Sequence, residues 1–179
     1  MHHSQHISAG EKAVALHDKV QTLLAEKLGD ALLRSQIDYE FPVFIVDKQH
    51  IYECLQLLRE EPSMKFDFLT TMCGAHFPEA GDAEFMMMYQ LHNLQANERI
   101  RIKTYTGAQD LELPTATTLW PAANWMEREA FDFYGFKFKG HPDLRRILNM
   151  DEMDYHPLRK QYALEDASRD DKKDLYFGR

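Results

Sequence analysis

The first apolar pattern along the chain is a helical one near its start. Ser8, followed three residues later by Glu11, is a capping-box pattern typical of a helix N-terminus. After it, apolar residues recur at intervals of three and four, as on one buried helix face: Leu16, Val20, Leu23, Leu24 and Leu28. Gly29 stands where such a helix commonly ends. The pattern therefore predicts an amphipathic helix that finishes at this glycine.

A second helix is indicated between Asp47 and Pro62. Asp47 can cap its first turn, and the helix stops before Pro62. Its apolar positions again fall on one face: Ile51, Cys54, Leu55 and Leu58. Just before it, the apolar run Val43–Val46 has the length of a short strand. This part of the chain therefore predicts a strand followed by a helix.

Three strand patterns follow the second helix. Their residues are Phe66–Met72, Glu84–Leu94 and Arg99–Tyr105. The segment 74–82 contains two glycines and a proline, which favours a loop. Residues 95–98 separate the second strand from the third, as a hairpin turn would. Short connections of this kind favour antiparallel neighbours.

The last of these strands alternates strictly between apolar and charged residues. Ile100 and Ile102 fall on one face, whereas the opposite face carries the cations Arg99, Arg101 and Lys103. We expect the apolar face to contact the core of the domain. The basic face is expected to meet solvent or a partner.

A third helix is predicted around Pro121, which suits a first helical turn. Its apolar stripe consists of Ala122, Trp125, Met126, Ala130 and Phe133. After Gly135 the regular patterns stop, although charges and prolines continue. Such a stretch is unusual in a compact domain unless it binds something or is disordered. We therefore divide the chain into a body, residues 1–135, and an extended docking tail, residues 136–179.

The order of helices and strands predicts an α+β fold. A mostly antiparallel sheet would carry helices on one face, and the irregular C-terminal tail would follow it. Of the 179 residues, 44% are hydrophobic and 28% are charged, as in a soluble globular domain. No apolar run approaches the roughly 18 residues that a membrane span needs.

Charge and cysteine content limit the partners and cofactors that we expect. The net charge of −8 argues against nucleic acid as the main partner, because phosphate binding needs a positive surface. The two cysteines, Cys54 and Cys73, are interpreted as small buried residues in a reducing compartment. An iron–sulfur cluster usually takes four thiolates. A cluster of that kind would therefore lie on another chain.

The densest group of charged residues begins in the third predicted helix. Arg128 and Asp132 are four residues apart and can pair on the helix surface. On a helical wheel, Glu129 falls between Trp125 and Phe133, inside the apolar stripe. A buried carboxylate needs a cationic partner or a raised pKa. We therefore expect Glu129 to contact a nearby arginine.

A motif that occurs twice follows this helix. Each copy has His-Pro, a leucine and two cations, and proline holds the preceding histidine in an extended conformation. Arginine favours bidentate pairing with carboxylates. The cations should either pair with acidic groups on a neighbouring protein or anchor the tail to the body: Arg145, Arg146, Arg159 and Lys160.

Together, the helix and the two motifs resemble the signature of the C-type subunit of proton-pumping NADH:quinone oxidoreductase, respiratory complex I. The match is dense over about 35 residues, far beyond a short motif that recurs by chance. It rests on Glu127, Arg128, Glu129, Asp132, Gly135, Gly140, His141, Pro142, Leu144, Arg145, Arg146, Ile147, Leu148, His156, Pro157, Leu158, Arg159 and Lys160. The chain departs from the family pattern at Tyr155, Gln161 and Ala163, where glycine, an acidic residue and proline are common.

The resemblance implies a structural and assembly subunit of the hydrophilic peripheral arm, with no catalytic, cofactor-binding or metal-binding residue of its own. FMN and iron–sulfur clusters on partner subunits would transfer electrons from NADH to quinone. The main neighbours would be the subunits that form the quinone site. The family also implies a peripheral position on the cytoplasmic side of the bacterial inner membrane. The equivalent subunit of a related quinone reductase or membrane-bound hydrogenase fits the same residues.

Two other functions stay open on the residues alone. A stand-alone metal or acid–base enzyme would combine His141, His156, Glu129 and Asp132, although no H-x-x-x-H, C-x-x-C or G-x-S-x-G spacing supports it. An RNA-binding sheet, which the net charge opposes, would use Arg99, Arg101, Lys103 and Tyr105.

Overall fold

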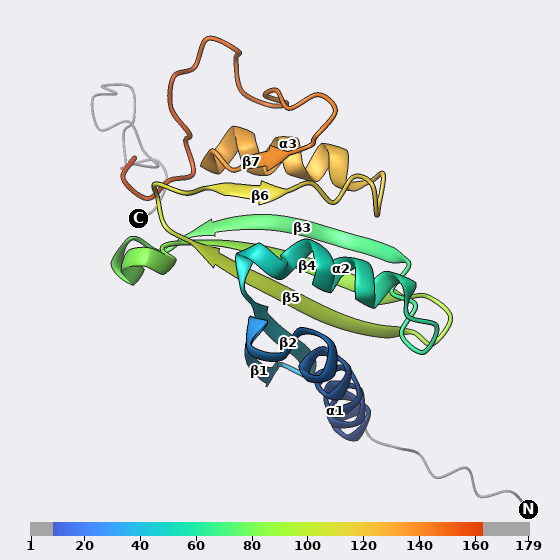
Figure 1. The fold of residues 1–179 in the computed structure, drawn as a ribbon. Helices are drawn as coiled ribbons and strands as arrows, with labels where there is room; N and C mark the ends of the chain where they lie inside the picture. The colour runs from blue at the N-terminus through green and yellow to red at the C-terminus, as the bar shows by residue number, and fades with distance from the viewer. Residues whose placement is uncertain (1–8, 163–179) are drawn as a thin grey trace, which may run out of the picture.

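The structure, a computed structural model, describes residues 9–162. At its centre is a five-stranded sheet with the strand order β1-β2-β5-β4-β3 (Figure 1). All neighbouring strands pair antiparallel except β2 and β5, which run parallel. The predicted, mostly antiparallel sheet is therefore confirmed. The strands are β1 (Leu32–Asp38), β2 (Phe41–Val46), β3 (Phe68–His76), β4 (Phe85–Asn93) and β5 (Glu98–Thr106).

Two helices lie on one face of this sheet, and the third packs along its edge strand β3 (Figure 1). Apolar residues of all three join one hydrophobic core with inward-facing strand residues such as Phe44, Tyr89 and Ile102. The first two helices bury the stripes that their periodicity predicted. The helices are α1 (Ala9–Leu28), α2 (Ile51–Glu60) and α3 (Ala123–Tyr134), with short 3₁₀ turns at Gly29–Ala31, Lys48–His50 and Pro78–Ala83. Of the three, α3 packs against the edge strand β3.

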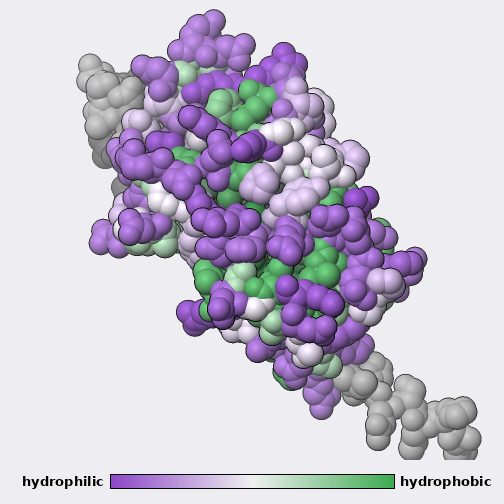
Figure 2. All heavy atoms as spheres, viewed as in Figure 1, coloured by the Kyte–Doolittle hydropathy of each residue, from purple (hydrophilic) through white to green (hydrophobic). Residues whose placement is uncertain are grey.

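Figure 2 views the molecule from the same side as Figure 1, where α1 and α2 lie toward the viewer. Hydrophilic side chains dominate this face, with small apolar areas between them. Among the helices within residues 9–162, none is both long and apolar enough to cross a membrane.

The sequence pattern missed the edge strand β1 and misplaced the loop after β3. None of the seven residues of β1 is buried, so it lacks the alternation that marks a half-buried strand. Gly74, which was expected in a loop, lies inside β3. It is a glycine because two rings pack over it. A Cβ there would lie 2.8 Å from Tyr134 Cδ2 and 2.9 Å from Phe136 Cε2.

The two cysteines differ in exposure. Cys54 of α2 is buried in the core, as predicted. Cys73 of β3 is exposed, so its predicted burial was wrong. It follows the buried Met72, and successive residues of a strand point to opposite faces of the sheet.

A small second sheet consists of one strand before α3 and one strand directly after it. Gly135 ends the helix with a φ of 85°, a left-handed conformation that glycine adopts easily. The chain then forms β7 (Lys137–Lys139), which pairs in parallel with β6 (Glu112–Pro114). Neither strand was predicted, because three residues are too few to show a period. Phe138 of β7 is buried in the main core.

After β7 the chain forms a long loop that runs back over α3 (Figure 1). Residues 141–162 contain no helix and no strand, in agreement with the irregular segment that was predicted. The division of the chain at Gly135 stays a prediction. Residues 163–179 of the expected tail, and Ser8 of the expected capping box, lie outside the described residues.

We predict that Gly74→Ala lowers the free energy of unfolding by about 1–3 kcal/mol, because the added methyl group overlaps two packed rings. Urea unfolding followed by circular dichroism measures it. Gly10→Ala is the control, since a Cβ at that helical position meets no atom within 4 Å. If Gly74→Ala and Gly10→Ala were equally stable, the two rings would have moved to accommodate the added methyl group.

Candidate functional site

The buried carboxylate of α3 is Glu127. Its side chain is fully inaccessible, and it accepts hydrogen bonds from the Ala116 backbone N–H at 2.6 Å and the Thr115 hydroxyl at 2.7 Å. Burial raises the pKa of Glu127 to about 7, although these two hydrogen bonds act to lower it. Glu127 therefore fastens α3 to the segment just after β6.

Glu129, which was predicted to be buried against an arginine, is exposed. That prediction was wrong because α3 is rotated from the expected orientation. Trp125, taken as a marker of the buried stripe, is 62% exposed. The buried face instead includes Ala123, Glu127 and Ala130. Polar residues on this face form hydrogen bonds with other segments of the chain, which makes their burial possible. A helical wheel that counts only apolar residues therefore predicts the wrong buried face.

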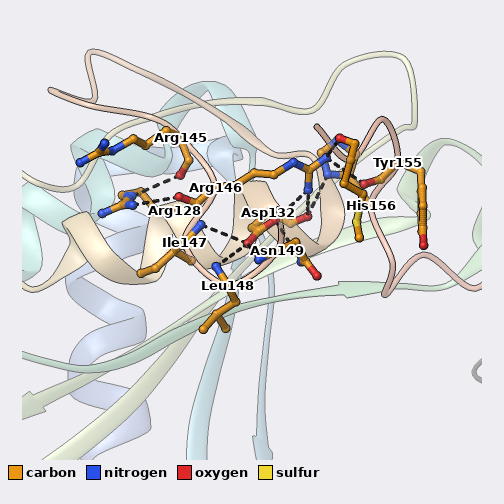
Figure 3. A network of polar contacts seen from close by, with 10 residues as sticks. Arg128, Asp132, Arg145, Arg146, Ile147, Leu148, Asn149, Tyr155 and His156 are labelled. Carbon is orange, nitrogen blue, oxygen red and sulfur yellow. Dashed lines mark hydrogen bonds and ion pairs between the residues drawn. The ribbon is translucent and has the colours of Figure 1, made fainter. Parts of the chain in front are cut away.

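The carboxylate of Asp132 is the centre of the polar network on α3 (Figure 3). It is fully buried. Oδ2 accepts hydrogen bonds from the backbone N–H groups of Ile147, Leu148 and Asn149 at 3.1, 2.8 and 2.9 Å. Oδ1 accepts from Arg146 Nη1 at 2.7 Å and from Asn149 Nδ2 at 3.0 Å. One helix side chain thus holds three consecutive residues of the loop.

These contacts keep Asp132 ionised. Burial alone would raise its pKa, but the hydrogen bonds from Asn149, Leu148 and Arg146 outweigh burial and hold the pKa of Asp132 well below its ordinary range. The buried charge is compensated by a guanidinium that is itself 9% exposed. The pair is therefore a buried ion pair whose partners are both hydrogen-bonded.

Arg146 connects a second turn of the loop to Asp132. Its Nη1 also donates to the backbone carbonyl of Asp132 at 3.1 Å. Its Nη2 donates to the carbonyls of Met153 and Tyr155 at 2.6 and 2.9 Å. Of the two roles predicted for this arginine, the structure shows the anchoring of the segment after α3 to the body.

Arg128 does not pair with Asp132, so the predicted helix-surface pair is wrong. Its Nε and Nη2 donate to the backbone carbonyls of Arg145 and Arg146 at 3.2 and 2.9 Å. Its guanidinium carbon lies 5.2 Å from the centre of the Trp125 ring. Arg128 therefore binds carbonyls at the start of the loop turn, and Asp132 binds the amides that follow.

The second His-Pro motif is fixed to the C-terminal end of α3. His156 Nδ1 donates to the Asp132 carbonyl at 3.0 Å, and Arg159 Nε donates to the Tyr134 carbonyl at 2.8 Å. A Cβ on Gly135 would lie 2.5 Å from Arg159 Nη2 and 2.7 Å from the His156 ring. Burial is the main reason that the pKa of His156 is lowered. Arg159, too, anchors the tail to the body.

The first His-Pro motif is joined to the opposite end of the helix. His141 Nε2 donates to the Asn124 carbonyl at 3.1 Å. Its Nδ1 accepts from the Asp143 N–H at 3.0 Å, which assigns the neutral Nε2–H tautomer. Pro142 beside it is exposed, whereas Pro157 of the second copy is partly buried.

Two of the predicted cations stay outside the network. The Arg145 side chain is exposed and pairs with exposed Asp143 at 2.9 Å. Lys160 is exposed, and its backbone N–H donates to His76 Nδ1 at 2.9 Å. Pairing of these two side chains with a neighbouring protein stays a prediction.

Sequence reasoning missed several members of the network: Thr115, Asn149, His76 and the carbonyl-bearing Met153 and Tyr155. These residues act through backbone groups or single polar atoms, which leave no periodic signal. Within residues 9–162, no three His, Cys, Asp or Glu side chains gather in a group that can hold a metal ion. The rings of His141 and His156 both donate to backbone carbonyls.

A model of the family described as "Respiratory-chain NADH dehydrogenase, 30 Kd subunit" matches residues 44–168. The chain belongs to this family. The match spans the whole Asp132 network, and it confirms the resemblance to the C-type subunit of complex I that the two His-Pro motifs predicted.

Relatives of this chain carry names that agree with the family. The C subunit of NADH-quinone oxidoreductase from Azorhizobium caulinodans is 40% identical over 137 residues, which are 76% of this chain and 64% of that protein. The C/D subunit of the same enzyme from Acinetobacter baumannii (strain AYE) is 40% identical over 145 residues, which are 78% of this chain and 24% of that protein. The chain therefore spans less than two thirds of the length of both relatives.

Two solved structures resemble this member of the 30 kDa subunit family. The trypsin-resistant fragment of Nqo5 is 26% identical with a TM-score of 0.59, covering 70% of this chain and 99% of the fragment. A chain of the membrane-bound sulfane sulfur reductase, an archaeal respiratory membrane complex, is 23% identical with a TM-score of 0.66, covering 84% of this chain and 86% of that one. The second likeness concerns the fold alone.

We predict that Asp132→Asn lowers the free energy of unfolding by about 3–5 kcal/mol, since it leaves the Arg146 charge buried without its counter-ion. Chemical denaturation of the purified chain measures the loss. Asp143→Asn is the matched control, because it breaks the exposed pair with Arg145 and should cost at most about 1 kcal/mol. A cost for Asp132→Asn as small as that of the control would contradict the central place of this carboxylate.

Glu127 should make stability depend on pH. Its pKa is raised from 4.5 to about 7, so the folded state binds the proton more tightly than the unfolded state. The resulting stabilisation is complete below pH 4.5 and is lost as pH rises through about 7. At about 1.4 kcal/mol for each tenfold change in proton affinity, the loss amounts to about 3 kcal/mol.

Glu127→Gln tests this dependence, because glutamine does not titrate, and it can accept from the Ala116 N–H while its NH₂ group donates to the Thr115 hydroxyl oxygen. The stability of the variant relative to the native chain should rise by about 3 kcal/mol between pH 4.5 and pH 8. Denaturant unfolding across this pH range measures the difference. A difference that does not vary with pH would show that Glu127 titrates normally.

Proposed function

We propose that this chain is a structural and assembly subunit in the peripheral arm of an NADH-quinone oxidoreductase. It holds neighbouring subunits in place, and FMN and iron–sulfur clusters on those subunits carry electrons from NADH to quinone. The complex works as a proton translocase, and this chain itself performs no catalytic step. Membership of the 30 kDa subunit family and the names of the relatives support this proposal.

The observation that carries the proposal is that the polar side chains of α3 bind the backbone of the loop after β7. Asp132 and Arg146 bind each other and several backbone groups of the loop, and Arg128 binds two further carbonyls. These groups are occupied in fixing one conformation of the loop. A loop fixed before binding loses little conformational entropy when a partner docks. The arrangement suits a preformed docking surface.

The fixed loop also exposes apolar side chains. Leu148 is 69% exposed and Met150 is 70% exposed, although Asp132 binds the Leu148 backbone. Trp125, on the neighbouring face of α3, is 62% exposed. Exposed apolar residues on a rigid frame are typical of protein–protein contact sites. We call Trp125, Leu148 and Met150 the loop contact set.

The neighbours proposed for this set are the subunits that form the quinone site. The relative with the C/D name suggests a D-type subunit as the first one to test. The assembled complex would place this chain on the cytoplasmic side of the bacterial inner membrane, peripheral to the bilayer. The fold likeness to a sulfane sulfur reductase complex supports a second candidate, the equivalent subunit of a related membrane-bound redox complex.

We predict that Leu148→Asp with Met150→Asp removes the chain from the complex but leaves its stability within about 1 kcal/mol, because both side chains are exposed. Affinity-tagged variants are expressed in place of the native subunit, and the NADH-quinone oxidoreductase is isolated from membranes. The amount of tagged chain bound to the complex and the NADH:quinone activity of the membranes should fall together.

Leu94→Asp serves as the control, since this leucine is 56% exposed in the turn between β4 and β5. It should co-purify like the native chain. A double variant that is fully retained in an inactive complex would contradict the assembly role. Co-purification of the native chain with a different redox complex would favour the second candidate.

A further inference from the structure

The central sheet has an outer face, opposite the face whose residues join the hydrophobic core. On β5 this face carries Arg99, Arg101 and Lys103, opposite the inward-facing isoleucines. Strand pairing places Arg34 of β1 in the same row as Lys103, with Ile45 between them. We call Arg34, Arg99, Arg101 and Lys103 the basic face. A chain with a net charge of −8 therefore concentrates four cations on one side of its sheet.

Arg101 at the centre of the basic face is held in position. Its Nε donates to Gln90 Oε1 at 2.7 Å, and its guanidinium carbon lies 4.5 Å from the centre of the Phe41 ring. Both contacts fix the plane of the guanidinium. Its terminal NH₂ groups form no ion pair with a carboxylate among residues 9–162. A fixed guanidinium of this kind is ready to pair with a carboxylate that comes from outside.

Within residues 9–162, few carboxylates lie close to the basic face. Asp38 lies 3.9 Å from Lys103, at the limit of an ion pair. In the described residues, neither Arg34 nor Arg99 has a carboxylate within ion-pair distance. The face therefore has an excess of positive charge that an acidic partner can neutralise.

Apolar side chains lie beside one end of the basic face. Strand pairing sets Met88 and Ile45 on either side of Lys103, and these three side chains are partly exposed. Phosphate-binding surfaces need a dense positive field, whereas this end of the face combines a cation with apolar surface. The mixture fits a polypeptide segment with both carboxylates and apolar residues better than it fits a nucleic acid.

At one end the basic face meets a cavity of about 760 Å³ between α1, the β1–β2 turn and the β4–β5 turn. Arg99 belongs to both surfaces, and Phe41, which contacts Arg101, lines the cavity together with Lys12 and Lys19 of α1. Two carboxylates stand there as well, Glu40 and Glu98. The cations thus continue from the flat sheet into a concave site that can receive a side chain.

We propose that the basic face binds an acidic segment of a neighbouring subunit, laid along β5 toward the cavity. Alternate side chains on a strand repeat about every 7 Å, so carboxylates at alternate positions of an extended segment can pair with Arg99, Arg101 and Lys103. The apolar residues of that segment would cover Met88 and Ile45. This contact lies on the sheet, apart from the loop contact set, and it rests on the proposed function because its partner belongs to the same complex.

Charge reversal tests the contact in the assembled complex. The double variant Arg99→Glu, Lys103→Glu is compared with Lys27→Glu, Lys65→Glu, which changes the net charge equally at exposed positions away from the face. Each tagged full-length chain replaces the native subunit, and the complex is isolated from membranes. The first variant should be recovered with the complex at least about tenfold less than the control, since reversed charges repel the acidic segment. Thermal unfolding confirms that both variants fold.

Photo-crosslinking keeps the proposal testable if the charge-reversed chain does not fold. A benzophenone amino acid replaces Met88 on the outer face, and Glu26 on α1 is the control position. Mass spectrometry of the isolated complex should find links from position 88 to a partner segment rich in Asp and Glu, and none to that segment from position 26.

The outcomes separate this inference from the proposed function. If the native chain does not co-purify with the complex, both fail. If it co-purifies but position 88 links to nothing, to a neutral or basic segment, or to nucleic acid, the acidic partner is wrong and the proposed function stands. Equal recovery of the two folded double variants would overturn the basic face as a contact in the same way.

Discussion

The arrangement of residues 141–160 depends on a single buried charge, the carboxylate of Asp132. It gathers three successive backbone amides and one guanidinium, and that guanidinium in turn binds the carbonyls of the next turn. Residues 141–160 form neither a helix nor a strand, so contacts with side chains such as Asp132 fix their conformation. The ordering of the loop is therefore a property of α3 as much as of the loop.

Two carboxylates five residues apart on α3 show how environment sets chemical state. Glu127 and Asp132 are both fully buried. Glu127 accepts two hydrogen bonds from neutral groups, and its pKa rises to about 7. Asp132 receives a charged partner and several amides, and its pKa falls. The same functional group thus has two roles: Glu127 binds the helix to the segment after β6 in a way that depends on protonation, and Asp132 binds the loop as an anion.

Sequence patterns predicted the fold well wherever a helix or strand buries one apolar face. The stripes of α1 and α2 and the alternation of β5 each have a single apolar face, and each was placed correctly. The patterns failed for β1, which has no buried residue, and for α3, whose buried face includes Glu127, Arg128 and Asp132. A polar side chain becomes compatible with a core only through partners far away in the chain. Periodicity cannot show such partners, so Glu129 was chosen in place of Glu127.

The candidate site was found by its motifs but not by its contacts. The cations of the His-Pro repeats lie in or beside the polar network, and the prediction left open whether they bind a neighbour or the body. Arg146 and Arg159 bind the body, through carbonyls of Met153, Tyr155 and Tyr134. Carbonyl groups are present on every residue, so no sequence pattern identifies which of them a guanidinium will select.

Asp132 recognises the loop through main-chain amides, and this has a consequence for how the surface can evolve. Ile147 and Leu148 are held by atoms that every residue except proline possesses. Their side chains are therefore free to change without loosening the frame that presents them. The exposed side chains of this turn can therefore change during evolution to match a changing neighbour, while Asp132 keeps the backbone of the turn in the same conformation.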